Sequence, residues 1–115
     1  PGYRARLEAV LGPLDASLLA RCRHVVLSPG LSRATPEIGA AAAAGVEIIG
    51  DIELFARAVN APVIAITGTN GKSTVTTLVG RMLEADGYRV KVGGNLGTAA
   101  LDLLESPAPD CYVLE

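Results

Sequence analysis

The chain has 115 residues, half of them apolar, and its formal net charge is −2. That length is enough for one ordinary domain with a real hydrophobic core. The slightly acidic balance argues against a nucleic-acid-binding protein, because such proteins cluster Lys and Arg against phosphate. No apolar run approaches the roughly 18 residues that a membrane helix needs, so we expect neither a nucleic-acid partner nor a membrane segment.

The start of the chain and its cysteines indicate a cytoplasmic protein. Residues 1–4 are polar and carry no signal peptide, and the absence of an initiator Met leads us to expect that the natural protein begins elsewhere. Cys22 and Cys111 stand at no spacing that metal ligands use. A disulfide between them is possible, but two small buried side chains in a reducing cytosol are the favoured interpretation. The sequence leaves the oligomeric state open.

Short apolar runs alternate with helical periodicity along the chain, which is typical of an α/β fold with a parallel sheet. In chain order we first predict a strand over 24–28, a helix from Pro36 to a C-terminus at Gly45, a strand over 46–49 and a helix capped by Asp51. After these we predict a strand over 63–66, a helix between a glycine-rich loop and Asp86, and a strand over 88–92. The last two predicted elements are a helix over 96–104 and a strand over 111–114. Thr35 is the predicted N-cap before Pro36.

Two of these predictions concern packing. The uninterrupted apolar strand over 63–66 is expected to be central and buried on both faces. The helix after the glycine-rich loop is expected to pack through one apolar face, formed by Val75, Leu78, Val79, Met82 and Leu83. A hinge at Asn60-Ala61-Pro62 places a domain boundary near residue 61, with parts of two α/β units on either side.

The strongest functional signal is Gly68-Thr69-Asn70-Gly71-Lys72-Ser73-Thr74, hereafter the phosphate loop, which follows a strand and opens a helix. Gly68 and Gly71 permit backbone angles closed to other residues, so successive N–H groups turn toward an anion at the helix N-terminus. Lys72 would then reach the β- and γ-phosphates, and the Ser73 hydroxyl would bind Mg²⁺. The sequence therefore predicts a site for ATP and Mg²⁺.

The phosphate loop departs from the strict pattern G-x-x-x-x-G-K-[ST], since Ile66 stands where that pattern has Gly. It is a shortened variant, with Gly68 three residues before Gly71. The alternative interpretation is a tight glycine turn with a solvated Lys. We favour the phosphate site because strand, loop and helix follow in the required order.

Glu115 is the second candidate. It lies at the carboxyl end of an apolar strand, the edge at which open α/β sheets bind ligands. It is predicted to be an acidic Mg²⁺ ligand, and the alternative is an ordinary solvated Glu.

Two glycine turns at strand ends are weaker candidates. In Gly93-Gly94-Asn95, hereafter the Gly-Gly-Asn turn, Asn95 caps the next helix, contacts substrate, or does both. Ser28-Pro29-Gly30 is either a plain turn or a second backbone anion site. His24 is assigned no functional role.

The phosphate loop with its preceding strand resembles the ATP loop of the Mur ligases, which add amino acids to the UDP-N-acetylmuramoyl precursor of peptidoglycan. Three further stretches resemble the D-glutamate-adding branch of that family, namely residues 27–30, 50–55 and 92–97, and the similarity runs from about residue 22 to residue 115. The phosphate loop alone indicates only the wider family, which includes folylpolyglutamate synthase.

The resemblance implies a Rossmann-like UDP-substrate domain, of which residues 1–60 are the end, and a P-loop ATP domain with a parallel sheet, of which residues 61–115 are the start. It implies ATP, Mg²⁺, UDP-N-acetylmuramoyl-L-alanine and D-glutamate as ligands and an acyl phosphate as the intermediate. Carried over by position, Lys72 and the phosphate loop from Gly68 to Thr74 hold ATP, and Ser73 and Glu115 hold Mg²⁺. Asn95 contacts the UDP-sugar, and Gly30 lies near its pyrophosphate.

The resemblance also implies three domains, of which the last, for the incoming amino acid, is missing from this chain. The chain is therefore expected to be a fragment without ligase activity of its own. The rival interpretations are a sibling Mur ligase, folylpolyglutamate synthase, an ATP-binding module without catalysis, and a structural remnant without a ligand.

Overall fold

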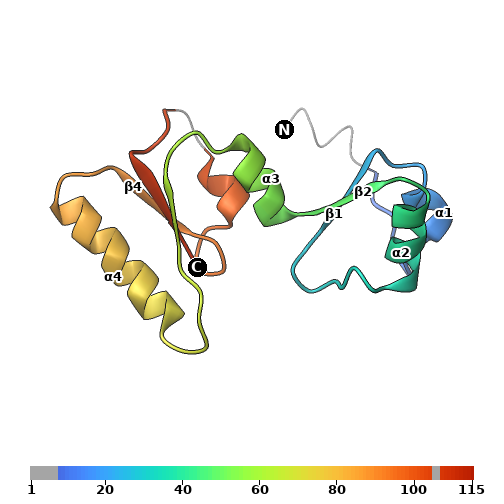
Figure 1. Ribbon diagram of the computed structural model, residues 1–115, viewed down its shortest axis with the longest axis horizontal. Coiled ribbons are helices and arrows are strands. Elements are labelled where there is room, and N and C mark those ends of the chain that lie inside the picture. Colours follow the sequence, from blue (N-terminus) through green and yellow to red (C-terminus); the bar gives the residue numbers. More distant parts are fainter. Residues whose placement is uncertain (1–7, 105–106) are drawn as a thin grey trace. The chain divides into compact units, whose positions relative to one another are not determined.

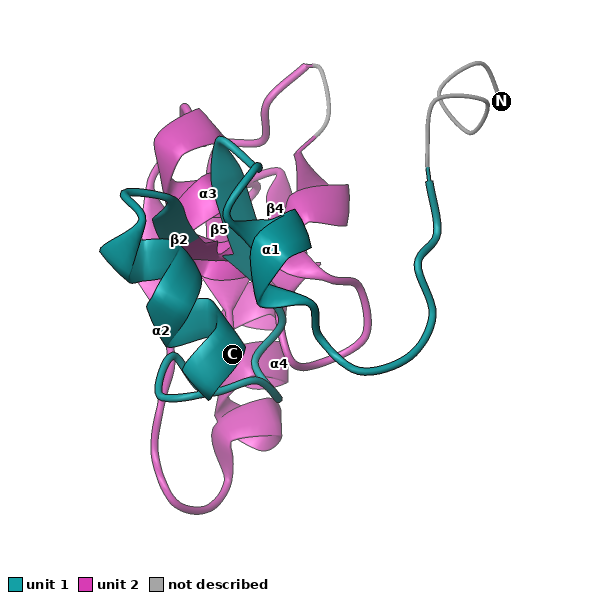
Figure 2. Cartoon of the chain, turned by 90° about the vertical axis from the view of Figure 1, so that its right-hand side faces the viewer, with its two compact units in different colours: residues 1–48 teal, residues 49–115 magenta. Residues whose placement is uncertain are grey.

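The computed structural model describes residues 8–104 and 107–115. By its internal contacts the chain falls into two compact units, which Figure 2 colours separately: unit 1 ends at Ile48 and unit 2 runs from Ile49 to Glu115. The elements alternate between helix and strand through both units (Figure 1), as the sequence predicts for an α/β protein. None of the helices in the described residues is long and apolar enough to cross a membrane.

The described residues of unit 1, from residue 8 onward, form two helices and a two-stranded sheet. The elements are α1 (Ala16–Leu19), β1 (His24–Leu27), α2 (Pro36–Ala43) and β2 (Glu47–Gly50), whose last residues enter unit 2, and β1 pairs with β2. Residues from both strand regions and α2 form its core: Val25, Leu27, Ile38, Ala41 and Val46. The predicted strands and the α2 start at Pro36 are confirmed to within one residue.

Helix α1 was not predicted, because four residues are too short to show a helical period. It begins where the Asp15 carboxylate accepts hydrogen bonds from the N–H groups of Ser17 and Leu18, at 2.8 and 3.3 Å. These bonds satisfy N–H groups of the first helical turn that have no partner within the helix. The cap is the local signal that identifies α1.

Unit 2 is a three-stranded parallel sheet with helices on both faces. Its elements are α3 (Asp51–Ala58), β3 (Val63–Ala65), α4 (Lys72–Ala85), β4 (Val90–Gly93), the 3₁₀ helix η2 (Ala100–Leu103) and β5 (Cys111–Leu114). The strand order is β3-β5-β4, and Val113 is the register partner of Ile64 on one side and of Val92 on the other.

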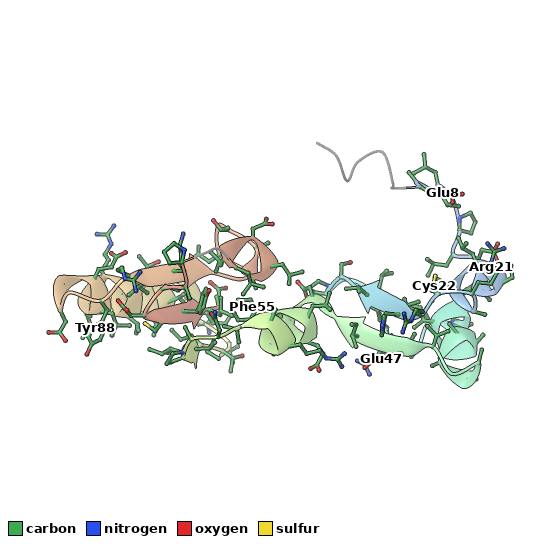
Figure 3. All side chains as sticks on the ribbon, turned by 90° about the horizontal axis from the view of Figure 1, so that it is seen from above. Glu8, Arg21, Cys22, Glu47, Phe55 and Tyr88 are labelled. Atoms are coloured by element: carbon green, nitrogen blue, oxygen red, sulfur yellow. The ribbon has the colours of Figure 1, made fainter. Side chains whose placement is uncertain are left out.

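The core of unit 2 is built on β5, all four residues of which are buried. Tyr112 and Leu114 pack with Phe55 of α3 and with η2. The rings of Phe55, labelled in Figure 3, and Tyr112 meet edge to face, with centroids 5.3 Å apart. Because side chains alternate along a strand, Val113 points to the opposite face, where α4 contacts β4 and β5.

Three predictions about unit 2 are wrong. The strand starting at Val63 is not central: β3 is an edge strand with exposed residues, because β5 returns to lie between β3 and β4. The helix expected over residues 96–104 is only the 3₁₀ turn η2. Asp51 is the first residue of α3 rather than its N-cap, which is Gly50.

The predicted packing face of α4 is also wrong in part. Val75, Leu78 and Met82 are exposed, whereas Thr76 and Gly80 are the buried residues of α4. Helix α4 lies so close to β4 that a Cβ on Gly80 would come within 2.6 Å of Val92 Cγ2. The close approach at the glycine therefore selects a different face from the one with the largest apolar side chains.

The contacts divide the chain after Ile48, earlier than the boundary expected near residue 61. The reason is that α3 packs on unit 2, where Phe55 belongs to the core. The assignment of residues 1–60 and 61–115 to two functional domains stays a prediction.

Candidate functional site

The three strands of the unit 2 sheet end at one edge, because they are parallel. Beyond β3 lies the phosphate loop, beyond β4 the Gly-Gly-Asn turn, and beyond β5 Glu115. Open parallel sheets bind their ligands at this edge. The structure thus brings together the candidate residues of unit 2 that the sequence leaves far apart.

The phosphate loop has the backbone geometry of an anion site. Gly68 has φ +153° and Gly71 has φ +74°, values that residues with a Cβ rarely adopt. Gly71 is the N-cap of α4, without a capping side chain, and no acidic residue occupies the first turn of α4. The N–H groups of that turn have no intrahelical partner, so they and the positive end of the helix dipole suit an anion.

Lys72 is the first residue of α4 and is partly buried. Its backbone carbonyl accepts a hydrogen bond of 2.7 Å from the hydroxyl of Thr76, which is fully buried. This bond fixes the first turn of α4 under the phosphate loop. The aliphatic part of Lys72 lies beside Gly68, with Cγ 3.9 Å from the position of a Cβ on that glycine.

The two predicted Mg²⁺ ligands lie in direct contact. The Ser73 hydroxyl donates a hydrogen bond of 2.6 Å to Glu115 Oε2, across 42 residues of sequence. A carboxylate and a hydroxyl are the hard oxygen donors that Mg²⁺ takes, and Mg²⁺ commonly uses one or two protein oxygens together with water and substrate phosphates. The described residues contain no cluster of three or more His, Cys, Asp or Glu side chains that would hold a metal by itself. The donor pair therefore fits a Mg²⁺ ion that arrives with nucleotide phosphates.

The Gly-Gly-Asn turn packs on the backbone of Glu115. The Glu115 N–H donates to the Gly93 carbonyl at 3.0 Å, and the Asn95 N–H donates to the Glu115 carbonyl at 3.2 Å. Asn95 is exposed and precedes η2 by several residues, so it does not act as the helix cap that we considered. The sequence did not indicate the contact with Glu115, because its two sides come from different strands.

A largely apolar cavity of about 430 Å³ opens beside these residues in unit 2. Its polar lining comes from Thr67, Lys72, Asn95 and Glu115, and its apolar lining from α3, β3 and their neighbours: Ile52, Phe55, Ala56, Val59, Val63, Ala65, Ile66 and Leu114. The helical spacing of Ile52, Phe55, Ala56 and Val59 is the signal in the sequence that predicts this wall.

The remaining candidates lie in unit 1. Gly30 is in a turn in which the Leu31 N–H donates to the Ser28 carbonyl at 3.1 Å. A Cβ on Gly30 would meet no atom within 4 Å, and its φ is not positive. These observations describe an ordinary turn and leave the anion role of Gly30 a prediction. His24 Nδ1 pairs with Glu47 Oε2 at 2.9 Å, and both side chains are exposed.

The cysteines are both free. Cys111 is buried in β5 as predicted, and burial and the neighbouring Asp110 raise its thiol pKa. The prediction for Cys22, which Figure 3 labels, is wrong: it follows the short helix α1 and is exposed.

Comparison with known proteins agrees with the resemblance seen in the residues. Residues 3–50 match the family model of the Mur ligase MurD-like N-terminal domain. Over 105 residues the chain is 61% identical to the UDP-N-acetylmuramoylalanine--D-glutamate ligase of Marinobacter nauticus and 56% identical to that of Nitrosococcus oceani. Each match covers 91% of this chain and 23% of the ligase, so the chain spans about a quarter of the length of these relatives.

Among solved structures, a pseudomurein peptide ligase type C from Methanothermus fervidus is 22% identical, with a TM-score of 0.38, and the match covers 87% of this chain and 21% of that one. Likeness at that level supports no conclusion about the fold. The similarity to Mur ligases rests on the sequences. Residues 3–50 are similar to the MurD-like N-terminal domain of Mur ligases, and over nearly its whole length the chain is similar to a segment of the D-glutamate ligases.

Proposed function

We propose that the protein containing this segment is an ATP-dependent ligase of peptidoglycan synthesis that joins D-glutamate to UDP-N-acetylmuramoyl-L-alanine in the cytoplasm. The observation that carries the proposal is the Ser73–Glu115 hydrogen bond, which unites an acidic strand end with the start of α4. A hydroxyl and a carboxylate at that place are the oxygen ligands of a nucleotide-bound Mg²⁺. The identity of 56–61% to D-glutamate ligases supports D-glutamate and UDP-N-acetylmuramoyl-L-alanine as the substrates.

The residues of this chain serve the first half of the reaction. The N–H groups of the phosphate loop and the Lys72 ammonium bind the β- and γ-phosphates, and Ser73 and Glu115 hold Mg²⁺, which neutralises phosphate charge when bound. Asn95 contacts the UDP-sugar, and Gly30 lies near its pyrophosphate. In this arrangement residues 1–60 are the end of a Rossmann-like UDP-substrate domain, and residues 61–115 the start of the P-loop ATP domain.

The chemistry is phosphoryl transfer followed by acyl transfer. The substrate carboxylate attacks the γ-phosphorus, the bond from that phosphorus to the β–γ bridging oxygen breaks, and ADP leaves. The D-glutamate amine then attacks the acyl carbon, inorganic phosphate leaves with the electrons of the C–O bond, and the nitrogen loses a proton. The contribution of this segment is positioning and charge neutralisation in the first transfer.

The test uses the protein extended to the length of its relatives. Phosphate release is followed with ATP, Mg²⁺ and UDP-N-acetylmuramoyl-L-alanine, with D-glutamate, L-alanine, L-lysine or meso-diaminopimelate as the amine. We expect turnover with D-glutamate alone. Turnover with another amino acid would assign the protein to a sibling ligase, and ATP binding without any turnover would favour a non-catalytic module.

Lys72→Ala tests the site itself. Removing the ammonium from the phosphates should weaken ATP binding by about tenfold or more, the effect of one charge-assisted contact of about 1.5–3 kcal/mol. The matched control is Lys91→Ala, which removes the same charge from β4, outside the lining of the cavity. Equal ATP affinity of the two variants would remove Lys72 from the site.

A further inference from the structure

Gly94 allows the Gly-Gly-Asn turn to lie directly against Glu115. A Cβ built on Gly94 would come within 2.6 Å of the Glu115 carbonyl oxygen and 3.2 Å of its nitrogen. The obstructing atoms belong to backbone, so a side chain at position 94 must displace the main chain of Glu115 or of the turn. The tertiary contact with Glu115 therefore excludes a side chain at position 94, and the positive φ of +100° disfavours one independently.

The same turn holds both backbone polar groups of Glu115. Its N–H donates to Gly93 at 3.0 Å, and its carbonyl accepts from Asn95 at 3.2 Å. The turn is itself closed by a hydrogen bond of 2.8 Å from the Gly94 N–H to the Thr98 carbonyl. Glu115 is therefore fixed through its backbone by the turn and through its carboxylate by Ser73 at 2.6 Å.

We propose that Gly94 is a positioning residue, which sets the Glu115 backbone so that its carboxylate reaches Ser73 and a Mg²⁺ bound there. The inference rests on the proposed function of Ser73 and Glu115. It adds a mechanical link, because the main-chain segment that carries Asn95 is the one that positions the metal ligand. Displacement of this turn therefore changes Mg²⁺ binding, although neither Gly94 nor Asn95 is a ligand of the ion.

Gly97 provides the matched control. It belongs to the same connection and has φ +67°, but a Cβ there would meet no atom within 4 Å. Gly94→Ala and Gly97→Ala both place a side chain at positive φ, with the local cost that this brings. Only Gly94→Ala also collides with Glu115, so the difference between the two variants isolates the collision.

The experiment uses the protein extended to the length of its relatives. It measures Mg²⁺ affinity by calorimetric titration of the ATP complex without excess ATP, and ATP affinity without Mg²⁺ in EDTA. We expect Gly94→Ala to weaken Mg²⁺ binding by about tenfold or more, in line with the cost of misplacing an active group by a fraction of an ångström. Mg²⁺-free ATP binding should stay within about twofold of wild type, because the phosphate loop is untouched. Gly97→Ala should preserve both affinities, and equal Mg²⁺ affinity of the two glycine variants would overturn the inference.

Glu115→Gln separates this inference from the proposed function. If Gly94 acts through Glu115, then adding Gly94→Ala to Glu115→Gln causes no further loss of Mg²⁺ affinity. If Gly94→Ala lowers Mg²⁺ affinity in the double variant as much as it does alone, the positioning role of Gly94 is overturned, whereas the proposed metal site stands. Wild-type Mg²⁺ affinity in the Glu115→Gln single variant would overturn the proposed metal site and the inference with it.

A measurement without substitution at position 94 covers the case in which Gly94→Ala does not fold. Binding of Mg²⁺ and ATP should slow amide hydrogen exchange at Asn95, whose N–H is bonded to Glu115. The slowing should disappear in Glu115→Gln. Unchanged exchange at Asn95 in the wild-type chain would refute the link between the turn and the metal ligand.

Discussion

Gly80 is the position at which α4 comes closest to the sheet, and Gly80→Ala tests the packing of unit 2. The new Cβ would lie 2.6 Å from Val92 Cγ2 and 3.8 Å from Val92 Cβ. The first distance is far below van der Waals contact, and Val92 is β-branched, so its χ1 is stiff. Either α4 must move away from β4 or Val92 must leave its rotamer.

Two opposing terms set the magnitude. Ala is favoured over Gly inside a helix by about 1 kcal/mol, whereas overpacking a well-fitted contact costs about 1–3 kcal/mol. We expect the cost of overpacking to exceed the gain in helix propensity, because the contact joins α4 to a strand of the unit 2 sheet. Gly80→Ala should therefore lower the stability of α4 by about 1 kcal/mol. Val92→Ala removes the colliding atom, so in that background the same substitution should become stabilising.

Native-state hydrogen exchange gives the assay, because it reports the stability of each helix separately. The control is Gly39→Ala in the middle of α2, where a new Cβ meets no atom within 4 Å and helix propensity acts alone. Gly39→Ala should slow exchange in α2, and Gly80→Ala should speed it in α4. Stabilisation of α4 by Gly80→Ala in the presence of Val92 would refute the close approach.

Two further predictions concern ionisation and thiol chemistry. Hydrogen bonds from the side chain and the backbone of Arg89 lower the pKa of Asp110 below its ordinary value of 3.8. The stability that the Asp110 carboxylate adds is therefore present above that value and is lost as pH falls through the lowered folded-state pKa. Between about pH 5 and pH 2 the free energy of unfolding in urea should fall less steeply for Asp110→Asn than for wild type, and parallel curves would contradict this. At neutral pH a thiol reagent should modify exposed Cys22 quickly and Cys111 only on unfolding, because Cys111 is buried with a raised pKa. Mass spectrometry measures the two modification rates, with Cys22→Ser as the control. Equal rates in the folded chain would show that β5 is accessible to the reagent and would contradict its burial.

The sequence predicted the elements that rest on local signals. The phosphate loop follows from glycines before a helix start, and their positive φ values in the structure agree with that interpretation. The parallel pattern also placed Glu115 at the edge that carries Ser73, since all strands of a parallel sheet end together. The 2.6 Å contact between these two residues was therefore within reach of sequence reasoning, although its ligand role stays a prediction.

Strand order and close approach were decided only by the tertiary structure. An apolar run does not reveal whether a strand is central. Among the described residues β3 is an edge strand, because β5 pairs on one side of it and no described strand pairs on the other. The buried face of α4 is set by the small residue Gly80, whereas the prediction placed that face at the largest apolar side chains. The contact of Gly94 with Glu115 likewise joins segments distant in the chain. Periodicity and turn chemistry act between near neighbours in the chain, so they can be read from the sequence. Strand pairing, and the close approach of another backbone segment to a glycine, depend on how the elements pack together.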